Sequence, residues 1–323
     1  MRLITAFVLV LVSLVCSLTF ADTPLPKLTE FKVKSSLDGT DQPSLVWAPT
    51  TATQRATPLF VFLHSWSGDY KQDNSKWQRQ AIKRGWIYLH PNFRGRNDHP
   101  EACGSKLARQ DIIDAIKSTR EKYKVDESRV YLCGVSGGGH MAMLMAGHFP
   151  QQFTAVSAWV GISNLADWYR FHTKKGKPGR YAQMVQKSVG GVPGKSSAID
   201  AQYKDRSPVF HVQNVKSLPI DINAGVNDGH TGSVPIAHSL KAFNVIAKSH
   251  GNELISETEM DELWKARKLS NPRDLDQKED ASYGRKILLR RISNKARVTI
   301  FDGGHESLPQ AACEWLASHT RGN

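Results

Sequence analysis

Short apolar runs alternate with longer amphipathic segments along most of the chain. Apolar runs of this kind are typical of strands buried on both faces of a sheet, and amphipathic segments are typical of helices that cover those faces. The alternation predicts an α/β fold with a mostly parallel central sheet and helices on both faces. A hairpin is expected over 31–49, strands over 58–64, 86–91, 130–133, 153–162, 219–226 and 297–302, and helices over 74–84, 106–123, 235–248 and 308–319.

Two segments interrupt this alternation. Residues 163–215 lose the apolar pattern and contain many glycine, proline and basic residues, which indicates a lid-like insertion. Residues 252–285 are highly charged, and their only helical pattern lies around 257–268. Neither segment carries a second core or an internal repeat, so residues 22–323 are predicted to form a single domain.

The first residues have the pattern of a targeting segment. Arg2 precedes an apolar run from Leu3 that continues to Phe20, and small residues at 19 and 21 are suited to cleavage before Asp22. Residues 1–21 are therefore predicted to be a signal peptide, and the mature protein to be secreted or periplasmic. An uncleaved membrane anchor is the alternative, since the run is long for a signal peptide.

The formal net charge of +13 favours anionic partners, and its distribution is uneven. No acidic residue lies between Asp167 and Asp200, whereas seven basic residues do. A solvated loop and a rim that attracts an acidic substrate both explain this segment. No nucleic-acid-binding motif accompanies the charge, so a nucleic-acid partner is not expected. The basic residues are Arg170, Lys174, Lys175, Lys177, Arg180, Lys187 and Lys195.

Cysteine usage gives a weaker signal. Three cysteines remain after the predicted cleavage, Cys103, Cys133 and Cys313, and Cys133 within an apolar strand reads as a small buried hydrophobe. A disulfide between Cys103 and Cys313 is one interpretation for an exported chain. No metal-ligand spacing is present, and neither a metal nor another cofactor is predicted.

The strongest chemical signal is the segment that follows the strand 130–133. It enters Gly134-Val135-Ser136-Gly137-Gly138 and continues directly into a helical pattern, the strand–turn–helix setting of a nucleophile elbow. Glycines at 134 and 138 allow the strand and the helix to pass close together. Ser136 is the predicted nucleophile, and the Gly137 N–H is suited to stabilise an oxyanion.

A serine nucleophile needs a general base and an acid that orients the base. His305 follows the last predicted strand and two glycines, and Asp228 follows the strand 219–226. Both lie where strands pass into loops, the edge at which such sheets gather their sites. Asp302 is the rival acid, and Asp221 is a poorer candidate because it lies inside a strand.

The loop after the strand 58–64 is expected to supply a second oxyanion donor, the backbone N–H of Ser65 or of Trp66. His64 and His140 lie beside the expected site and are predicted to shape the substrate pocket. Aromatic residues near the site suit sugar stacking, although core and lid packing explains them equally well. They are Trp66, Trp159, Trp168 and Tyr169.

Taken together, these motifs resemble the catalytic domain of the prolyl oligopeptidase family, within the α/β-hydrolase superfamily. The resemblance covers most of residues 31–319 and implies a serine hydrolase with a Ser–Asp–His triad. It is carried by the Asp38-Gly39 hairpin, the His64 loop, the Asn92-Phe93-Arg94-Gly95 loop, Asp111 and Asp114 (both expected to be structural), the elbow at 134–138, the Asp228 loop up to Val234-Pro235, and His305.

Three departures from the family pattern bear on specificity. Few residues separate the predicted cleavage site from the first hairpin, so the family's N-terminal propeller is expected to be missing. His64 occupies the loop that carries the family's oxyanion-hole tyrosine. Residues 229–232 lengthen the loop after Asp228.

These features predict a secreted, propeller-less serine hydrolase that forms an acyl-enzyme, more suited to an ester than to a peptide bond. Its expected substrate is a small molecule, a peptide or an acylated carbohydrate that can be acidic, and no membrane contact is expected after signal cleavage. A serine oligopeptidase or aminopeptidase acting on short peptides is the alternative. A catalytically inactive binding protein on the same fold is a second alternative from a different functional class, and the sequence does not define the oligomeric state.

Overall fold

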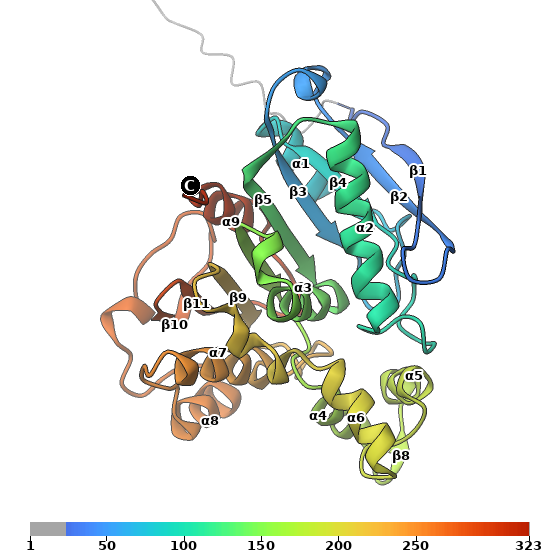
Figure 1. Cartoon of the computed structure of the whole chain (residues 1–323). Helices are drawn as coiled ribbons and strands as arrows, with labels where there is room; N and C mark the ends of the chain where they lie inside the picture. Colours follow the sequence, from blue (N-terminus) through green and yellow to red (C-terminus); the bar gives the residue numbers. More distant parts are fainter. Residues whose placement is uncertain (1–23, 323) are drawn as a thin grey trace, which may run out of the picture.

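A computed structural model describes residues 24–322, and the predicted signal peptide, residues 1–21, lies outside the described residues. Within that range the chain builds a nine-stranded sheet and a separate two-stranded hairpin (Figure 1). The strands are β1 Thr29–Lys34, β2 Asp41–Trp47, β3 Thr57–Leu63, β4 Ile87–Pro91, β5 Val125–Val135, β6 Ala155–Trp159, β7 Thr173–Lys174, β8 Lys177–Pro178, β9 Ile220–Gly225, β10 Ile287–Ser293 and β11 Ala296–Phe301.

The large sheet has the strand order β1-β2-β4-β3-β5-β6-β9-β11-β10. The strands from β4 to β11 in this order are parallel, whereas the β1–β2 hairpin and β10 add antiparallel strands at the two edges. One row of register partners, Val61, Leu132, Val156 and Ile220, crosses four central strands. The predicted α/β-hydrolase class, with its mostly parallel sheet, is confirmed.

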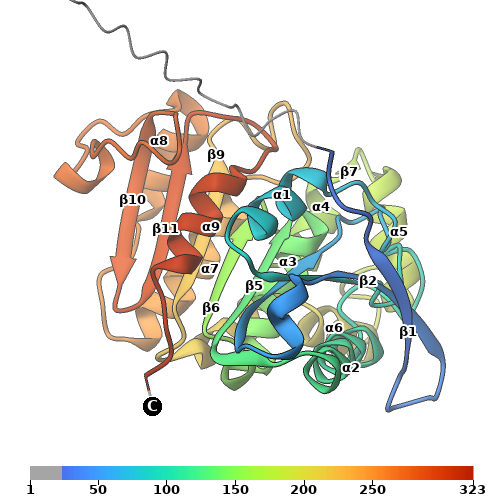
Figure 2. The same ribbon diagram turned by 90° about the horizontal axis from the view of Figure 1, so that it is seen from above.

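Helices cover both faces of the sheet (Figure 2). Helices α1 and α9 contact each other on one face, and α2, α3 and α7 lie on the other. This division follows from right-handed crossovers. The connection from β3 to β4 runs toward the β1 edge of the sheet, whereas the connections from β4 to β9 run toward the β10 edge, so their helices lie on opposite faces. The helices are α1 Ser75–Lys83, α2 Lys106–Lys122, α3 Gly137–His148, α4 Leu165–Phe171, α5 Arg180–Val189, α6 Ser197–Asp205, α7 Ala237–Ser249, α8 Glu257–Ala266 and α9 Pro309–Ala317, with short 3-10 helices at Thr50–Thr53, Pro150–Gln152, Pro208–Phe210, Val212–Val215 and Asp274–Asp276.

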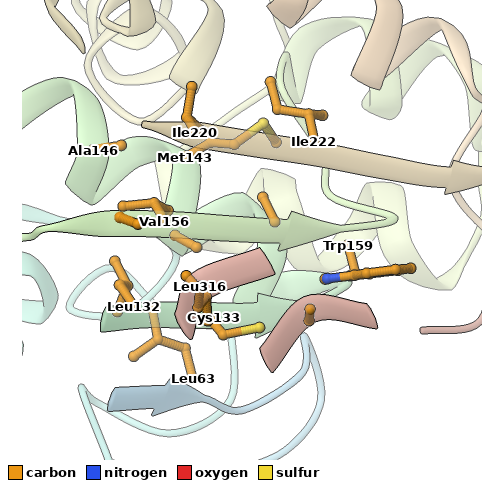
Figure 3. Packing of buried hydrophobic residues seen from close by; sticks show 14 of the residues in the cluster. Leu63, Leu132, Cys133, Met143, Ala146, Val156, Trp159, Ile220, Ile222 and Leu316 are labelled. Atoms are coloured by element: carbon orange, nitrogen blue, oxygen red, sulfur yellow. The ribbon is translucent and has the colours of Figure 1, made fainter. Parts of the chain in front are cut away.

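The main core lies between these layers. Figure 3 shows Leu132, Val156 and Ile220 of the central strands packed with Met143 of α3 and Leu316 of α9. The elbow helix α3 is apolar all round because it is buried from Gly137 to Gly147. Three methionines of that helix, Met141, Met143 and Met145, fill the core. None of the helices in residues 24–322 combines the length and the apolar character that a membrane span requires.

Residues 163–215, here called the helical insertion, are more ordered in structure than the sequence pattern predicts. They form α4, α5 and α6 and the β7–β8 hairpin, beyond the ends of β3 and β5 to which the strand arrows point in Figure 1. An apolar cluster separate from the main core holds them together. The cluster joins Trp168, Val185 and Tyr203 of the insertion to Trp66 and Val234 of the main domain.

Residues 252–285, here called the charged insertion, contain the helix α8 where the sequence predicts one. The strand β10 that follows is absent from the sequence prediction, because Arg290 and Arg291 interrupt its apolar pattern. Both arginines are nevertheless buried: Arg290 pairs with Asp280 at 3.0 Å, and Arg291 pairs with Glu259 at 2.6 Å. Ion pairing therefore allows a charged segment to form an edge strand.

The expected disulfide between Cys103 and Cys313 is wrong. Cys103, Cys133 and Cys313 are all buried free thiols, and they lie in different packing environments. Cys103 belongs to the cluster of the helical insertion, whereas Cys133 and Cys313 belong to the main core. Burial raises the pKa of the Cys103 and Cys313 thiols to about 12, so both behave as small apolar side chains.

Candidate active site

Ser136 lies on the turn between β5 and α3 with a strained backbone, φ 59° and ψ −115°. A non-glycine residue adopts a positive φ only where its surroundings enforce it. Here the flanking glycines do so: a Cβ on Gly134 would lie 2.2 Å from the Gly138 carbonyl oxygen, and one on Gly138 would lie 2.2 Å from the carbonyl oxygen of Leu63. The sequence-predicted elbow therefore has the close backbone approach that its glycines indicate.

Asp228 and His305 meet at the ends of the neighbouring strands β9 and β11. The His305 Nδ1 lies 2.7 Å from the Asp228 Oδ2, and the Asp228 side chain is fully buried. Gly225 permits this approach, because a Cβ there would lie 2.3 Å from the carbonyl oxygen of Gly304. A carboxylate on Nδ1 holds the imidazole in the tautomer that leaves Nε2 free to accept a proton.

The two rival carboxylates lie elsewhere. Asp302 is exposed, and Asp221 pairs with Arg297 at 2.8 Å inside the sheet. Of the three aspartates considered from the sequence, the structure therefore brings Asp228 to the His305 ring.

The loop after Asp228, residues 228–234 and here called the acid loop, closes around its carboxylate. The Asp228 Oδ1 accepts hydrogen bonds from the backbone N–H groups of Gly229 at 2.9 Å and Val234 at 3.0 Å. A Cβ on Gly232 would lie 2.2 Å from that oxygen and 2.6 Å from the Cβ of His305. The residues that lengthen the loop thus pack directly on the pair and orient it.

The loop after β3, residues 64–68 and here called the oxyanion loop, distinguishes the two candidate donors. The Ser65 N–H donates to the Oε1 of Gln72 at 3.0 Å, so this donor is already engaged. Within residues 24–322 the Trp66 N–H has no hydrogen-bond partner, and its nitrogen lies 2.3 Å from where a Cβ on Gly137 would be. The Gly137 N–H, in the first turn of α3, is also outside the helical ladder. The geometry favours Trp66 over Ser65 as the second donor.

Two residues that sequence reasoning missed support this loop. Gln72 engages the Ser65 N–H, and Asn97 donates to the Trp66 carbonyl from its backbone N–H at 3.0 Å and from its side-chain amide at 3.2 Å. Both side chains are ordinary polar loop residues in the sequence. Their partners depend on the folding of whole loops, so no local signal identifies them.

His64 and His140 support neighbouring backbone segments and do not line an open pocket, so the prediction that they shape the substrate pocket is wrong. His64 is fully buried and stacks on Phe93 with 3.8 Å between ring centroids, and its nitrogens lie 3.1 Å from the Ser65 carbonyl oxygen and 2.5 Å from that of Asn92. His140 is also fully buried, and its Nε2 lies 2.8 Å from the carbonyl oxygen of Arg206. Burial lowers the pKa of both rings, that of His140 to about 4, so both are neutral at pH 7.

The aromatic residues proposed for sugar stacking are mostly enclosed. Trp159 is fully buried in the main core, where its indole N–H donates to the Ser157 hydroxyl at 2.9 Å. Trp168 and Tyr169 lie in the cluster of the helical insertion, and only 8% of Tyr169 is exposed. The expectation of open stacking faces is therefore wrong for Trp159 and Trp168, because both rings are used in packing.

Asp111 and Asp114 are structural, as the sequence predicts. The Arg94 guanidinium donates to Asp38 in the first hairpin and to Asp111 in α2, and Asp114 accepts the Ser36 N–H at 2.7 Å. Burial lowers the pKa of Arg94, but its hydrogen bonds to Asp38 and Asp111 outweigh burial and raise that pKa above its ordinary value. This network ties the edge hairpin to α2.

One group of residues in the described range has the composition of a metal site, His148, Asp205 and His211, with ligand atoms within 4.8 Å of one another. Arg109 already occupies this group, because its guanidinium lies 3.1 Å from the His148 Nε2 and donates to Asp205 at 3.1 Å. A cation in that position opposes the binding of a metal ion.

Comparison with known proteins identifies the family of the chain. The model of the prolyl oligopeptidase family matches residues 73–283. Feruloyl esterase B of Neurospora crassa is 40% identical over 118 residues, which cover 33% of this chain and 39% of that protein. The uncharacterized peptidase YtmA of Bacillus subtilis is 24% identical over 163 residues, 50% of this chain and 58% of that protein. Acetylxylan esterase A of Emericella nidulans is 26% identical over 115 residues, 32% of this chain and 38% of that protein.

Solved structures show the same fold. The acylaminoacyl peptidase of Pyrococcus horikoshii superposes with a TM-score of 0.62 at 18% identity, over 92% of this chain and 41% of that chain. Prolyl oligopeptidase B of Galerina marginata gives a TM-score of 0.56 at 18% identity, over 73% of this chain and 34% of that chain. The chain thus spans between about one third and three fifths of the length of these five proteins. Because the family model covers more than half of its length, the chain belongs to the prolyl oligopeptidase family of serine hydrolases.

Proposed function

We propose that this protein is a serine esterase that forms an acyl-enzyme on Ser136. His305 acts as the general base, Asp228 orients it, and the N–H groups of Gly137 and Trp66 stabilise the oxyanion. The observation that carries the proposal is the 2.7 Å contact between His305 and the buried Asp228, at the same sheet edge as the strained elbow. Each of these residues follows a strand, so all converge at the carboxyl ends of β3, β5, β9 and β11.

Ester hydrolysis proceeds in two steps, acylation and deacylation of Ser136. The Ser136 oxygen attacks the ester carbonyl while His305 takes the hydroxyl proton, and the resulting oxyanion accepts the two backbone N–H groups. Collapse breaks the bond to the alcohol, which leaves with the proton from His305, and the acyl group remains on Ser136. Water then attacks the acyl-enzyme with the same base, releasing the carboxylic acid and restoring the serine.

An ester substrate is favoured over a peptide by the matched relatives. Feruloyl esterase B and acetylxylan esterase A each match about a third of the chain, and their names describe esterases of feruloyl groups and of acetylated xylan. We therefore place an acylated carbohydrate first among the substrates. The exposed basic side chains of the helical insertion add a preference for an acidic one.

Export of the protein is part of the proposal. It rests on the sequence of residues 1–21, with Arg2 before an apolar run and small residues before Asp22. Expression of the full chain, followed by N-terminal sequencing of the protein from the medium or periplasm, tests it. An N-terminus at Asp22 is expected, and retention of the intact chain in the membrane fraction contradicts cleavage.

The proposed activity is tested by comparing residues 22–323 with the Ser136→Ala variant on aryl esters, acylated oligosaccharides and peptidyl amides. Ester turnover is expected to fall by at least about 10³-fold in the variant, because the nucleophile is lost. Asp302→Asn is the matched control and retains activity, since that carboxylate is exposed. Clear amide cleavage makes the protein a peptidase instead. If a fluorophosphonate probe fails to label Ser136, the protein is an inactive binding protein on this fold.

A further inference from the structure

The peptide group between Ser233 and Val234 is hydrogen-bonded at both ends. Its N–H, from Val234, donates to the Oδ1 of Asp228 at 3.0 Å. Its carbonyl oxygen, from Ser233, accepts the indole N–H of Trp168 at 2.8 Å and contacts the Nε2 of His172 at 2.8 Å. One planar group therefore joins the buried acid of the site to two side chains of the helical insertion.

Both donors are firmly held. The side chain of Asn164 caps α4 by accepting the N–H groups of Ala166 and Asp167, and His172 is the C-cap of that helix. The Trp168 ring packs against Trp66 of the oxyanion loop at 4.6 Å and against the His172 ring at 5.1 Å. Trp168 thus contacts the oxyanion loop with its ring and the acid loop with its N–H.

The protonation of His172 follows from its partner. A carbonyl oxygen can only accept, so the Nε2 of His172 carries a proton and donates it. Burial lowers the pKa of His172, and the ring is neutral at pH 7. Two donors therefore occupy both lone pairs of the Ser233 carbonyl oxygen.

We infer that Trp168 and His172 are positioning residues for Asp228, acting through the Ser233–Val234 peptide; this rests on the proposed function. Two donors on the carbonyl fix the peptide plane and polarise it, which makes the Val234 N–H a better donor to the carboxylate. The carboxylate in turn holds the imidazole of His305. The insertion is thereby part of the catalytic framework rather than a cover that lies over it.

The test separates the hydrogen bonds from the packing. Trp168→Phe keeps an aromatic ring and removes the N–H, and His172→Phe does the same at the second donor. We expect each to lower kcat by about three- to tenfold with KM unchanged. His172→Gln, which retains a side-chain N–H donor, should recover most of the loss. Trp315→Phe, in α9 and against His319, is the matched control and keeps the native kcat.

A pH profile supplies a readout that packing alone does not move. A carboxylate with one weakened N–H donor attracts the protonated imidazole more strongly, so the acid limb of kcat/KM should move to higher pH in both Phe variants. Native kcat together with a native acid limb in both variants overturns the inference. If Trp168→Phe does not fold, as judged by thermal unfolding, the His172→Phe and His172→Gln pair decides the question.

The labelling rate of Ser136 with a fluorophosphonate probe distinguishes the two failures without a known substrate. Slower labelling of the Phe variants than of the native protein supports the positioning role. Labelling at the native rate in all variants contradicts that role and leaves the proposed function intact. Absence of labelling in the native protein contradicts the proposed function, and the inference with it.

Discussion

Both insertions bury apolar side chains, but they differ in the polar contacts that accompany this packing. The helical insertion packs through an apolar cluster that includes Trp168 and Tyr203, and its hydrogen bonds reach the acid loop. The charged insertion packs apolar side chains such as Leu263 and Tyr283 into the main core and adds buried ion pairs. Asp276, fully buried, accepts from Arg291 and from the backbone N–H of Arg290 at 2.7 Å. In Figure 1 the helical insertion lies at the right-hand end of the molecule, and α8 and β10 lie at the left.

Both insertions contact the acid loop, since the Trp264 ring of α8 lies 3.7 Å from the His230 ring, but the helical insertion hydrogen-bonds the peptide group that holds Asp228. Apolar packing and neutral hydrogen bonds give the helical insertion a fixed geometry against two catalytic loops. The ion pairs of the charged insertion instead neutralise the arginines of β10, so that an edge strand can cover β11. We therefore expect changes in the helical insertion to affect turnover, and changes in the ion pairs that bury the β10 arginines to affect stability alone.

The largest effect is expected from Tyr203→Ala. Tyr203 is buried in the cluster of the helical insertion, and its hydroxyl donates to the Gly191 carbonyl at 3.0 Å. Removing the ring should destabilise the insertion by about 3–5 kcal/mol and lower kcat more than tenfold, because α4 loses its support. Thermal unfolding and ester kinetics measure both. Tyr203→Phe, which loses only the hydrogen bond, should cost about 1 kcal/mol. A folded Tyr203→Ala variant with native kcat would contradict this division of roles.

Asp276→Asn tests the charged insertion. The substitution leaves the buried Arg291 without its closest carboxylate, which should lower the free energy of unfolding by about 3 kcal/mol. The kcat of the folded protein should not change. Asp274→Asn is the matched control, because Asp274 is exposed two residues away and should have little effect. A fall in kcat at full folding would mean that the ion pairs of Asp276 also position the site.

Acid should loosen the helical insertion before the charged one. Burial lowers the pKa of His238 to about 3, and the Nδ1 of that ring accepts the Ser163 N–H at the start of the insertion. Lys241, His140 and His172 face His238, and all three oppose its protonation. Because the unfolded chain binds this proton near pH 6.5, stability is lost as the pH falls below that value.

The carboxylates of the charged insertion respond at lower pH. Hydrogen bonds from Ser282 and Arg290 outweigh burial and lower the pKa of Asp280, and a hydrogen bond from Arg273 lowers that of Glu253. Their stabilisation is present above about pH 4 and is lost below it. Hydrogen exchange at several pH values, corrected for intrinsic rates, should show residues 163–215 opening before residues 252–285. The reverse order would contradict the assignment of forces.

The smallest effect is expected on the surface of the helical insertion. Lys174, Lys175 and Lys177 are exposed on the β7–β8 hairpin. Replacing all three with alanine should reduce kcat/KM about two- to threefold on acidic acylated oligosaccharides, with less effect at high salt and none on neutral ones. Lys265→Ala in α8 is the control. Equal turnover of neutral and acidic substrates by the native protein would contradict the proposed preference for acidic sugars.

The sequence predicts the parts of the molecule whose signals are local. The central strands are continuous apolar runs, and the elbow carries its glycines beside Ser136, so sheet and elbow follow from short windows. The residues His305 and Asp228 follow because each comes directly after a strand. The structure adds the contact between His305 and Asp228. The sequence alone does not predict this contact, because the acid loop is longer than is usual in the family.

Other features depend on partners that are distant in sequence. The strand β10 is hidden by Arg290 and Arg291, whose burial depends on carboxylates of the preceding insertion. The basic residues and glycines of 163–215 obscure a helical pattern, since apolar residues at helical spacing form α5 between Gly179 and Gly190. The choice of Trp66 over Ser65 depends on Gln72, which lies beyond the reach of local pattern reasoning.

The contact at Ser233 is made by the main chain, and this has a consequence for variation among related sequences. Any residue at 233 supplies the same carbonyl oxygen, so the side chain at this position can vary or be redesigned without changing the hydrogen bonds that orient Asp228. Position 234 does not have this freedom with respect to proline, which has no N–H to donate to Asp228. A search for paired substitutions would therefore overlook the link between α4 and the acid loop. One partner in that link is a backbone carbonyl, which is the same for every amino acid at position 233.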